Sequence, residues 1–410
     1  MPQGSCDRVS CTGHGTCVLE AEGPTCECEA GYHAVGSACL SDSSDLGALA
    51  EIVGTMTPGV WKEISGAHLQ DVFLARAQSD AIDPRIWELG PSAVLHLWCS
   101  SAFDGRRWYF GDCGGHNGYN GNELYAFDLV TLAWSRLYDP SPLTDLHVTE
   151  SSNDMVPVWG PAAAHHYDDF IYSKKANALF VFWPFPGASS TAPKSWRFKL
   201  DVPDPALAWQ PFPSPAEAMP EGRWDQPYYK TAIHPDTGEI IIYGGASSAT
   251  GVAALDPVTL TYSRSGGFWD QTVATNSVAD IDPVRRRMYS MNVFGAGTGS
   301  TSGVLSIDID ASPLAQNQTT LGGTPPIGPY ACFIHHAASG LMWAWEGARE
   351  TFTFDPSTAT WTHYANAAGP APTLTAADNG PFQKCIYIPE LDVLAGYNNE
   401  TEGVWLYRLP

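Results

Sequence analysis

Residues 231–245 read Thr231-Ala-Ile-His-Pro-Asp-Thr-Gly-Glu-Ile-Ile-Ile-Tyr-Gly-Gly245, two apolar runs separated by a polar turn. Turn-forming residues between two such runs predict a β-hairpin, and the glycine doublet ends its second strand. A third apolar run follows and ends at Asp256, with Thr259 and Tyr262 beyond it at regular spacing. This segment therefore predicts one antiparallel unit of four strands.

The aspartate-to-aromatic pattern recurs in register at Phe127-Asp128…Thr131…Trp134 and at Phe354-Asp355…Thr358…Trp361. Comparable first strands begin near six positions, namely Leu95, Tyr167, Tyr228, Asn276, Tyr330 and Phe382. Their spacing of 48 to 72 residues is typical of repeats with loops of variable length. We therefore predict six blades. A seventh blade would have to lie in residues 65–94 or 138–164, where no hairpin is recognisable.

The last of these units lacks one strand, because only three strands are predicted between residue 382 and the end of the sequence. Gly59–Ile64 has the aromatic and polar character of the outer strands, and we expect it to close the ring and remove the sheet edge. The glycine doublets and the aspartate-to-tryptophan strands resemble those of kelch-type propellers over residues 58–410. The resemblance implies an all-β, six-bladed kelch-like β-propeller.

The composition agrees with this fold and excludes several classes of function. The 410 residues are 44% hydrophobic and 16% charged, and they include 39 glycines and 32 prolines. Such a chain is globular and rich in turns. The formal net charge of −23 disfavours nucleic acid and anionic membranes as partners. The sequence contains no apolar run long enough for a membrane span.

Six of the ten cysteines fall within the first 39 residues, and sequence alone leaves fifteen ways of pairing them. Such a cluster predicts an oxidising compartment and therefore a secreted or cell-surface protein. The spacing resembles that of an EGF-like domain. The resemblance implies the pairs Cys6–Cys17, Cys11–Cys26 and Cys28–Cys39. We expect a module at residues 1–41, a linker at 42–57 and the propeller at 58–410, with the module as a spacer or a means of self-association.

The other four cysteines are Cys99, Cys113, Cys332 and Cys385. The first two are predicted on the paired strands of blade one, two residues out of direct opposition. The last two are predicted at equivalent first-strand positions in neighbouring blades. We expect disulfides at these positions, and a thiol role is the alternative.

Polar and aromatic residues gather where a propeller places its first-strand starts and its loops from second to third strand, on one face around the channel. His96 and His116 belong to blade one, and two histidines that titrate near neutrality are well suited to acid–base chemistry. The remaining polar and aromatic residues on this face are His165, His166, Tyr167, Asp168, Trp224, Tyr228, Tyr229, Lys230, Asn276, Tyr330, Gln383 and Lys384. The competing interpretation is that each is an ordinary packing or hydrogen-bonding residue.

The placement of these histidines resembles that in propeller-fold polysaccharide lyases such as ulvan lyases and oligogalacturonate lyases. The resemblance implies β-elimination on a uronate-containing glycan, with His96 or His116 as the base and Tyr167 as the acid. The sequence departs from the ulvan type near Trp183, where that type has an arginine. Neutralisation of the uronate carboxylate would then fall to Arg197, Arg223 or Lys230.

Two other classes of function compete with the lyase. The same face suits an adhesion or matrix protein that binds a glycan or a protein without turnover. A metal held by His96, His116 and His165 is the third hypothesis, although no short ligand spacing supports it and we predict no cofactor. Galactose-oxidase-like copper enzymes also use a kelch propeller, and they require a cross-linked tyrosine and cysteine for which this sequence has no recognisable motif.

Overall fold

The protein is described by a computed structural model. It describes residues 15–20, 23–28, 32–35, 38–41, 46–75, 90–113, 119, 121–144, 156–161, 163, 166–182, 194–219, 229–244, 250–268, 277–292, 303–314, 319–322, 324–328, 330–365, 369–373 and 380–410.

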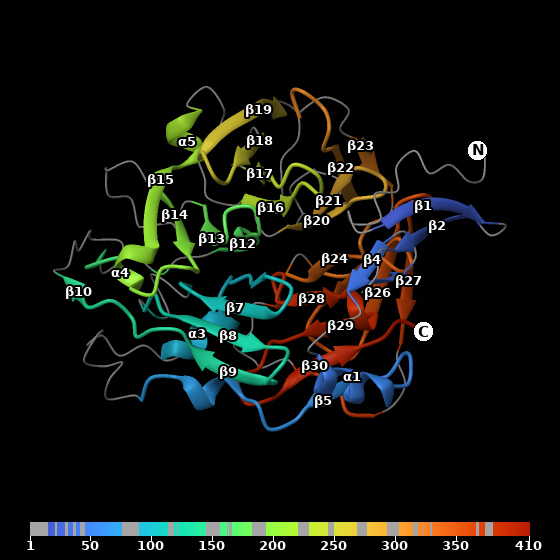
Figure 1. Cartoon of the computed structure of the whole chain (residues 1–410), viewed down its shortest axis with the longest axis horizontal. Coiled ribbons are helices and arrows are strands. Elements are labelled where there is room, and N and C mark those ends of the chain that lie inside the picture. Colours follow the sequence, from blue (N-terminus) through green and yellow to red (C-terminus); the bar gives the residue numbers. More distant parts are fainter. Residues whose placement is uncertain are drawn as a thin grey trace.

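Six four-stranded antiparallel sheets are formed by the described residues, and they are arranged as the blades of a propeller (Figure 1). Five of these blades run in chain order from the channel outward, and the sixth takes its outermost strand from the other end of the chain. Blade one contains β6 (Ala102–Phe103), β7 (Arg107–Gly111), β8 (Leu124–Asp128) and β9 (Ala133–Arg136). Blade two contains β12 (Phe170–Ser173), β13 (Ala178–Val181), β14 (Lys194–Lys199) and β15 (Trp209–Pro213). Blade three contains β16 (Tyr229–Ile233), β17 (Ile240–Gly244), β18 (Thr250–Asp256) and β19 (Thr261–Phe268).

Blade four contains β20 (Val278–Asp282), β21 (Arg287–Asn292), β22 (Gly303–Asp308) and β23 (Thr319–Leu321). Blade five contains β24 (Cys332–His336), β25 (Leu341–Trp345), β26 (Thr351–Asp355) and β27 (Thr360–Tyr364). Blade six contains β28 (Cys385–Ile388), β29 (Val393–Gly396), β30 (Val404–Tyr407) and, from the other end of the chain, β5 (Lys62–Ile64). A two-stranded sheet of β10 (Leu143–Thr144) and β11 (Val156–Pro157) lies between blades one and two in sequence.

The ring closes as predicted, because β5 pairs antiparallel with β30 and sets Glu63 opposite Trp405. Trp61 anchors this closing strand. It is buried against Trp345 and Tyr407, with ring centroids 5.4 and 4.9 Å away, and its indole nitrogen donates to the carbonyl of Arg349. The closing strand therefore ties residues near position 60 to blades five and six.

The core lies between neighbouring blades, and strand alternation explains it. Along β17 every residue is buried, but successive side chains point to opposite faces of the blade. Ile241 packs toward blade four, in a cluster with Met288, whereas Ile240 and Ile242 pack toward blade two, in a cluster with Phe180. Strands that are buried on both faces appear in a sequence as continuous apolar runs. Residues 240–243 form such a run, and the hairpin could therefore be predicted from the sequence.

Blade one and the region before it differ from the prediction. Its first strand begins at Ala102, not near Leu95, because residues 93–96 form the short helix α3 (Ala93–His96) after a 3₁₀ turn at Gly90–Ser92. Part of the predicted linker is helical too. α1 (Gly47–Gly54) buries Leu49 and Val53 in the core cluster shared by blades one and six. The other short helices are Leu69–Val72, α4 (Pro205–Ala208), α5 (Pro215–Ala218) and Pro389–Leu391.

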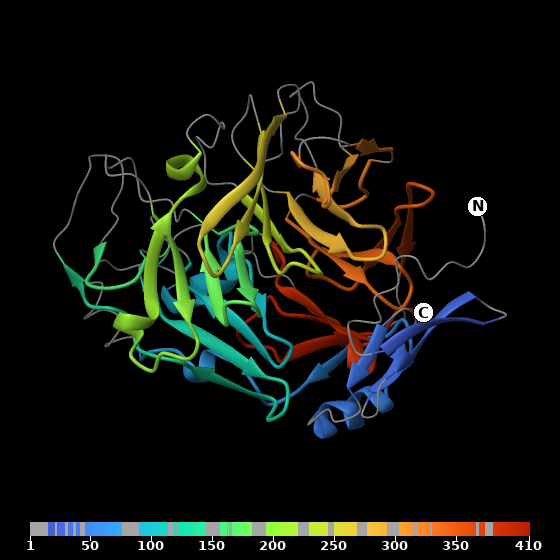
Figure 2. The ribbon, with the colours of Figure 1, turned by 45° about the horizontal axis from the view of Figure 1, so that its top comes forward.

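The cysteine-rich region forms two hairpins at the rim of the ring (Figure 2). β1 (Gly15–Glu20) pairs with β2 (Gly23–Cys28), and β3 (Tyr32–Val35) pairs with β4 (Ala38–Ser41). Cys17, Cys26 and Cys28 are disulfide-bonded. Cys6 and Cys11 lie outside the described residues, so the implied pairing stays a prediction, as do the EGF-like assignment and the domain boundaries. Within the described part of the chain, no helix is long and apolar enough to cross a membrane.

Candidate functional site

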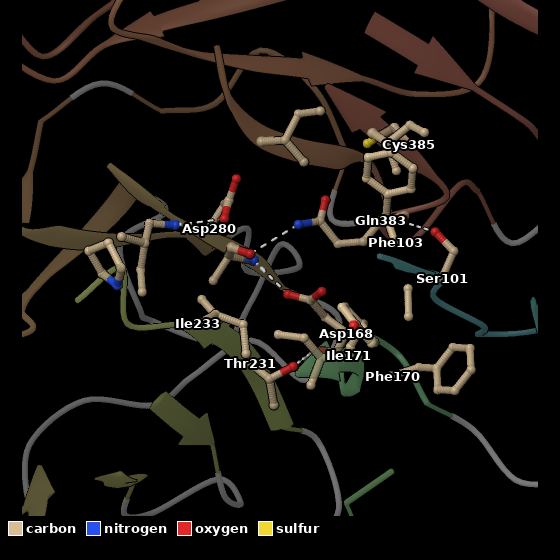
Figure 3. A pocket seen from close by; sticks show the side chains of 18 of the residues that line it. Ser101, Phe103, Asp168, Phe170, Ile171, Thr231, Ile233, Asp280, Gln383 and Cys385 are labelled. Atoms are coloured by element: carbon tan, nitrogen blue, oxygen red, sulfur yellow. Dashed lines mark hydrogen bonds between the residues drawn. The ribbon is translucent and has the colours of Figure 1, made fainter. Parts of the chain in front are cut away.

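The channel is bridged by side chains that hydrogen-bond to the inner strands, as Figure 3 shows. Asp168 of blade two accepts the backbone N–H of Ala279 in blade four at 2.7 Å. Gln383 of blade six donates through Nε2 to the carbonyls of Ala279 and Phe333, and accepts the Phe333 N–H at 2.6 Å. The inner edge of each first strand has no neighbouring strand, so its polar groups need such partners. These two side chains therefore hold the blades together across the channel.

Three aromatic rings lie at the end of the channel where the first strands begin. Phe382 is buried and lies between the other two, with ring centroids 5.9 Å from Tyr167 and 5.0 Å from Tyr330. Tyr167 is also buried, whereas Tyr330 is 38% exposed. The ammonium of Lys384 lies 5.7 Å from the Phe382 centroid and donates to the carbonyl of Cys99. We call Tyr167, Phe382 and Tyr330 the aromatic row.

The backbone beneath the aromatic row adopts unusual conformations. Tyr167, Phe382 and Gln383 have φ values of 42°, 38° and 59°. Residues other than glycine rarely adopt this left-handed region, and such strain is concentrated at functional sites. The fold therefore holds these rings in place at some cost in conformational energy.

His96 lies at the end of α3 and is only 3% exposed. Its Nε2 lies 2.7 Å from a carboxylate oxygen of Glu400, in the loop between β29 and β30. A carboxylate at this distance fixes the orientation and tautomer of an imidazole. The arrangement suits a positioned base chemically, but burial separates this histidine from bulk solvent.

A second buried histidine, which the sequence did not single out as catalytic, lies between two carboxylates. Nε2 of His166 lies 3.4 Å from the Asp112 carboxylate, and Nδ1 lies 3.2 Å from that of Asp169. Neither carboxylate receives a well-aligned hydrogen bond from a described side chain. Burial raises the pKa of Asp169 to about 7 and raises that of Asp112 well above its usual value.

Other predicted site residues have structural surroundings. Tyr229 and Lys230 begin β16 and are fully buried, and burial lowers the pKa of the Lys230 ammonium to about 7. Arg197 lies within β14, where its guanidinium donates to Gln210 and to the carbonyl of Pro257. None of these contacts joins Arg197 to His96 or Tyr167. The other candidates, His116, His165, Arg223, Trp224 and Tyr228, lie outside the described residues.

All four cysteines of the propeller are used in disulfides. Cys99 bonds to Cys113 and Cys332 bonds to Cys385, with Cα atoms 5.8 and 6.1 Å apart. Cys99 and Cys113 flank the strands of blade one and do not lie on them, which corrects their predicted position and accommodates the bond. No propeller thiol is left for a cross-link with tyrosine, so the residues do not fit the copper-oxidase hypothesis.

The metal hypothesis gains no support from the described residues, among which no group of three or more His, Cys, Asp or Glu side chains is arranged to hold an ion. Two of its three proposed ligands, His116 and His165, lie outside the described residues.

Glu400 is a site residue that sequence reasoning missed. It follows Asn398 and Asn399 in a loop from second to third strand, and the same rule that selected His116 would have found it.

No family model and no curated protein sequence matches this chain. Solved structures of similar shape include an auxiliary nutrient binding protein from Bacteroides ovatus, with 12% identity and a TM-score of 0.47, covering 83% of this chain and 75% of that one. A protein of the same description from Bacteroides thetaiotaomicron has 10% identity and a TM-score of 0.45, covering 76% and 68%. An exo-β-1,3-galactanase from Phanerochaete chrysosporium has 12% identity and a TM-score of 0.40, covering 68% of each chain. Similarity at this level does not indicate a function for this chain.

Proposed function

We propose that this protein is a secreted glycan-binding propeller, and that its binding surface is the channel mouth at the aromatic row. The observation that carries the proposal is the exposed ring of Tyr330, supported from below by the buried Phe382. Aromatic rings with a polar edge stack on the apolar faces of sugars and hydrogen-bond to their hydroxyls. A rigidly held ring loses little conformational freedom on binding, which favours affinity.

The charge of the chain points to the class of glycan. A formal net charge of −23 repels polyanions at long range, and the ammonium groups of Lys230 and Lys384 are both fully buried. A neutral saccharide meets no such repulsion. We therefore expect neutral glycans to bind more tightly than uronate polymers.

Burial also favours binding over cleavage. A general base must come within hydrogen-bond reach of the proton that it removes, about 3 Å. His96 and Tyr167 are both buried, and Arg197 contacts Gln210 and Pro257. A bound glycan would touch the exposed Tyr330 before it reached either candidate for acid–base chemistry.

Polysaccharide β-elimination is the second candidate, and the pairing of His96 with Glu400 is the observation that favours it. In that reaction His96 would remove the proton on the carbon that bears the uronate carboxylate. Tyr167 would protonate the departing glycosidic oxygen as the carbon–oxygen bond breaks and the double bond forms. Glu400 would act as a positioning residue that stabilises the imidazolium.

Glycan-array screening followed by calorimetry tests the proposal. We expect a neutral glycan to bind the whole chain, and Tyr330→Ala to weaken its Kd about tenfold, in line with the energy of ring contacts. Tyr330→Phe keeps the ring and should change Kd less than threefold. Tyr364→Ala, on the outer strand β27 of the same blade, is the matched control and should bind normally. If no glycan binds and a protein partner is captured at this face, the protein-binding form of the adhesion hypothesis is favoured.

A separate assay tests the lyase. Incubation with a panel of uronate polymers yields unsaturated products that absorb in the ultraviolet if β-elimination occurs. Product formation that is lost in His96→Ala would establish the second candidate. Absorbance that stays at background across the panel, while glycan binding persists, would exclude it.

A further inference from the structure

A cavity of about 340 Å³ lies in the channel, lined by first-strand residues of all six blades and by residues that precede or follow those strands (Figure 3). Every blade contributes at least one large apolar side chain of its first strand to the wall, among them Phe103, Ile171, Ile233, Ile281, Ile334 and Ile386. A volume of this size lies at the lower end of the range for small-molecule sites. The wall therefore suits a small molecule with an apolar body.

Asp168 supplies the polar end of this cavity. It is only 6% exposed, and one of its carboxylate oxygens, Oδ2, accepts the N–H of Ala279. No described residue donates to the other oxygen, Oδ1, in a cavity lined by this side chain. By contrast, the amide of Gln383 uses both Nε2 and Oε1 in hydrogen bonds to the inner strands. Oδ1 of Asp168 is therefore a hydrogen-bond acceptor in the cavity wall that a donor on a ligand could use.

The charged groups around the cavity favour a positively charged donor over a neutral one. Asp280 also lines the cavity, and its two oxygens already accept the N–H groups of His335 and Ile281. The charged neighbours of the Asp168 carboxyl are Lys230, Asp280 and Asp169, and of these only Asp280 lines the cavity. A cavity lined by two carboxyl groups, in a chain with a net charge of −23, favours a positively charged ligand.

We propose that this cavity binds a small amphipathic cation, a primary ammonium group on a short hydrocarbon body. The ammonium donates to Oδ1 of Asp168, and the hydrocarbon lies against the ring of apolar side chains. None of the three rings of the aromatic row lines this cavity, and the proposal does not rest on glycan binding.

Binding is expected to release a proton. Burial raises the pKa of Asp168 well above its usual value, so the carboxyl group of the empty site keeps its proton to a higher pH than an exposed aspartate does. An arriving ammonium favours the carboxylate, and the acid proton passes to the buffer. The positive charge of the ligand then replaces that proton at the carboxylate, and the charges balance.

Calorimetry with n-hexylammonium and n-hexanol tests the proposal on the unmodified protein. We expect n-hexylammonium to bind at least tenfold more tightly than n-hexanol, which has a similar shape but no charge. The binding enthalpy of n-hexylammonium should also differ between phosphate and Tris buffers, because the buffer takes up the released proton and the two buffers differ in their heat of protonation. Equal binding of the two probes would show an apolar cavity without cation selectivity and would overturn the proposal, as would no binding of either.

Two variants locate the site. Asp168→Asn keeps an acceptor for Ala279 and should weaken n-hexylammonium binding at least tenfold, while n-hexanol binding changes little. Asp355→Asn is the matched control, a turn aspartate on blade five that accepts the N–H of Ser357 and should bind normally. Ile233→Phe fills the cavity and should weaken both probes, so it tests the location even if Asp168→Asn does not fold. Unchanged n-hexylammonium binding in folded Asp168→Asn or Ile233→Phe would overturn the proposal.

Discussion

Nε2 of Gln383 in blade six donates a hydrogen bond to the carbonyl of Ala279 in blade four, at 3.0 Å. Asp168 of blade two accepts the N–H of the same alanine. Both polar backbone groups of Ala279 are thus satisfied by side chains from other blades. The inner strands can face a channel without forming a further sheet because these side chains take the place of a neighbouring strand.

Gln383→Leu should lower the free energy of unfolding by about 3 kcal/mol, because it removes the Gln383 hydrogen bonds to the N–H and C=O of Phe333 and to the C=O of Ala279. Urea denaturation followed by tryptophan fluorescence measures the change. Gln210→Leu removes a glutamine on the outer strand β15 and should cost under about 1 kcal/mol. Equal losses in the two variants would contradict the bridging role.

Asp169→Asn should make the protein relatively more stable as pH rises. The pKa of Asp169 is raised to about 7 in the folded state, above its ordinary value of 3.8. Stability from the protonated group is therefore complete below pH 3.8 and is lost as pH rises toward 7, by about 1.4 kcal/mol per pH unit at most. The Tm of the variant minus the Tm of the parent, measured from pH 4 to pH 8, should increase with pH up to about pH 7. Asp139→Asn, at an exposed aspartate paired with Arg136, is the control variant measured over the same pH range.

Removal of the Cys332–Cys385 disulfide should cost more stability than removal of Cys99–Cys113. The first bond spans 53 residues and the second 14, and a longer loop restricts the unfolded chain more. The chain-entropy relation gives about 4 kcal/mol for the first and about 3 kcal/mol for the second. Paired cysteine-to-serine variants compared by denaturation midpoint measure both losses, and a reversed order would contradict the expectation.

A chain of residues 46–410 should fold, whereas a chain of residues 65–410 should not form a stable ring. The first keeps α1 and the closing strand β5, including the buried Trp61. The second exposes the edge of β30 and the aromatic surface that Trp61 covers. The two chains are compared by their soluble yield and their Tm. A shorter chain as stable as the longer one would show that ring closure by β5 is dispensable.

The sequence predicted the architecture well where burial on both faces of a blade imposes an apolar pattern. The repeats around Asp128, Asp256 and Asp355 indicated the outer hairpins, and the missing strand of the last unit indicated the role of Gly59–Ile64. The predicted start of blade one was wrong by several residues. Val94 and Leu95 are apolar because they pack in a short helix, and an apolar run of this length does not distinguish helix from strand.

The candidate site was predicted only as a set of residue types on one face. Glu400 and His96 are 304 residues apart, and their contact arises because blade six returns beside blade one when the ring closes. Periodicity carries no information on such pairs, nor on which side chains are buried. The paired Cys99 and Cys113 likewise depend on backbone positions that strand counting misplaced.

The amino-acid sequence by itself determined six four-stranded units, their order and the closing strand, because local strand patterns and turns specify each unit. Only the tertiary structure decided that Tyr330 is exposed while Tyr229 and Lys230 are buried. It also decided that Asp168 and Gln383 span the channel to Ala279. Those outcomes depend on distances between blades, which arise when the ring closes and the inner strands meet around one axis.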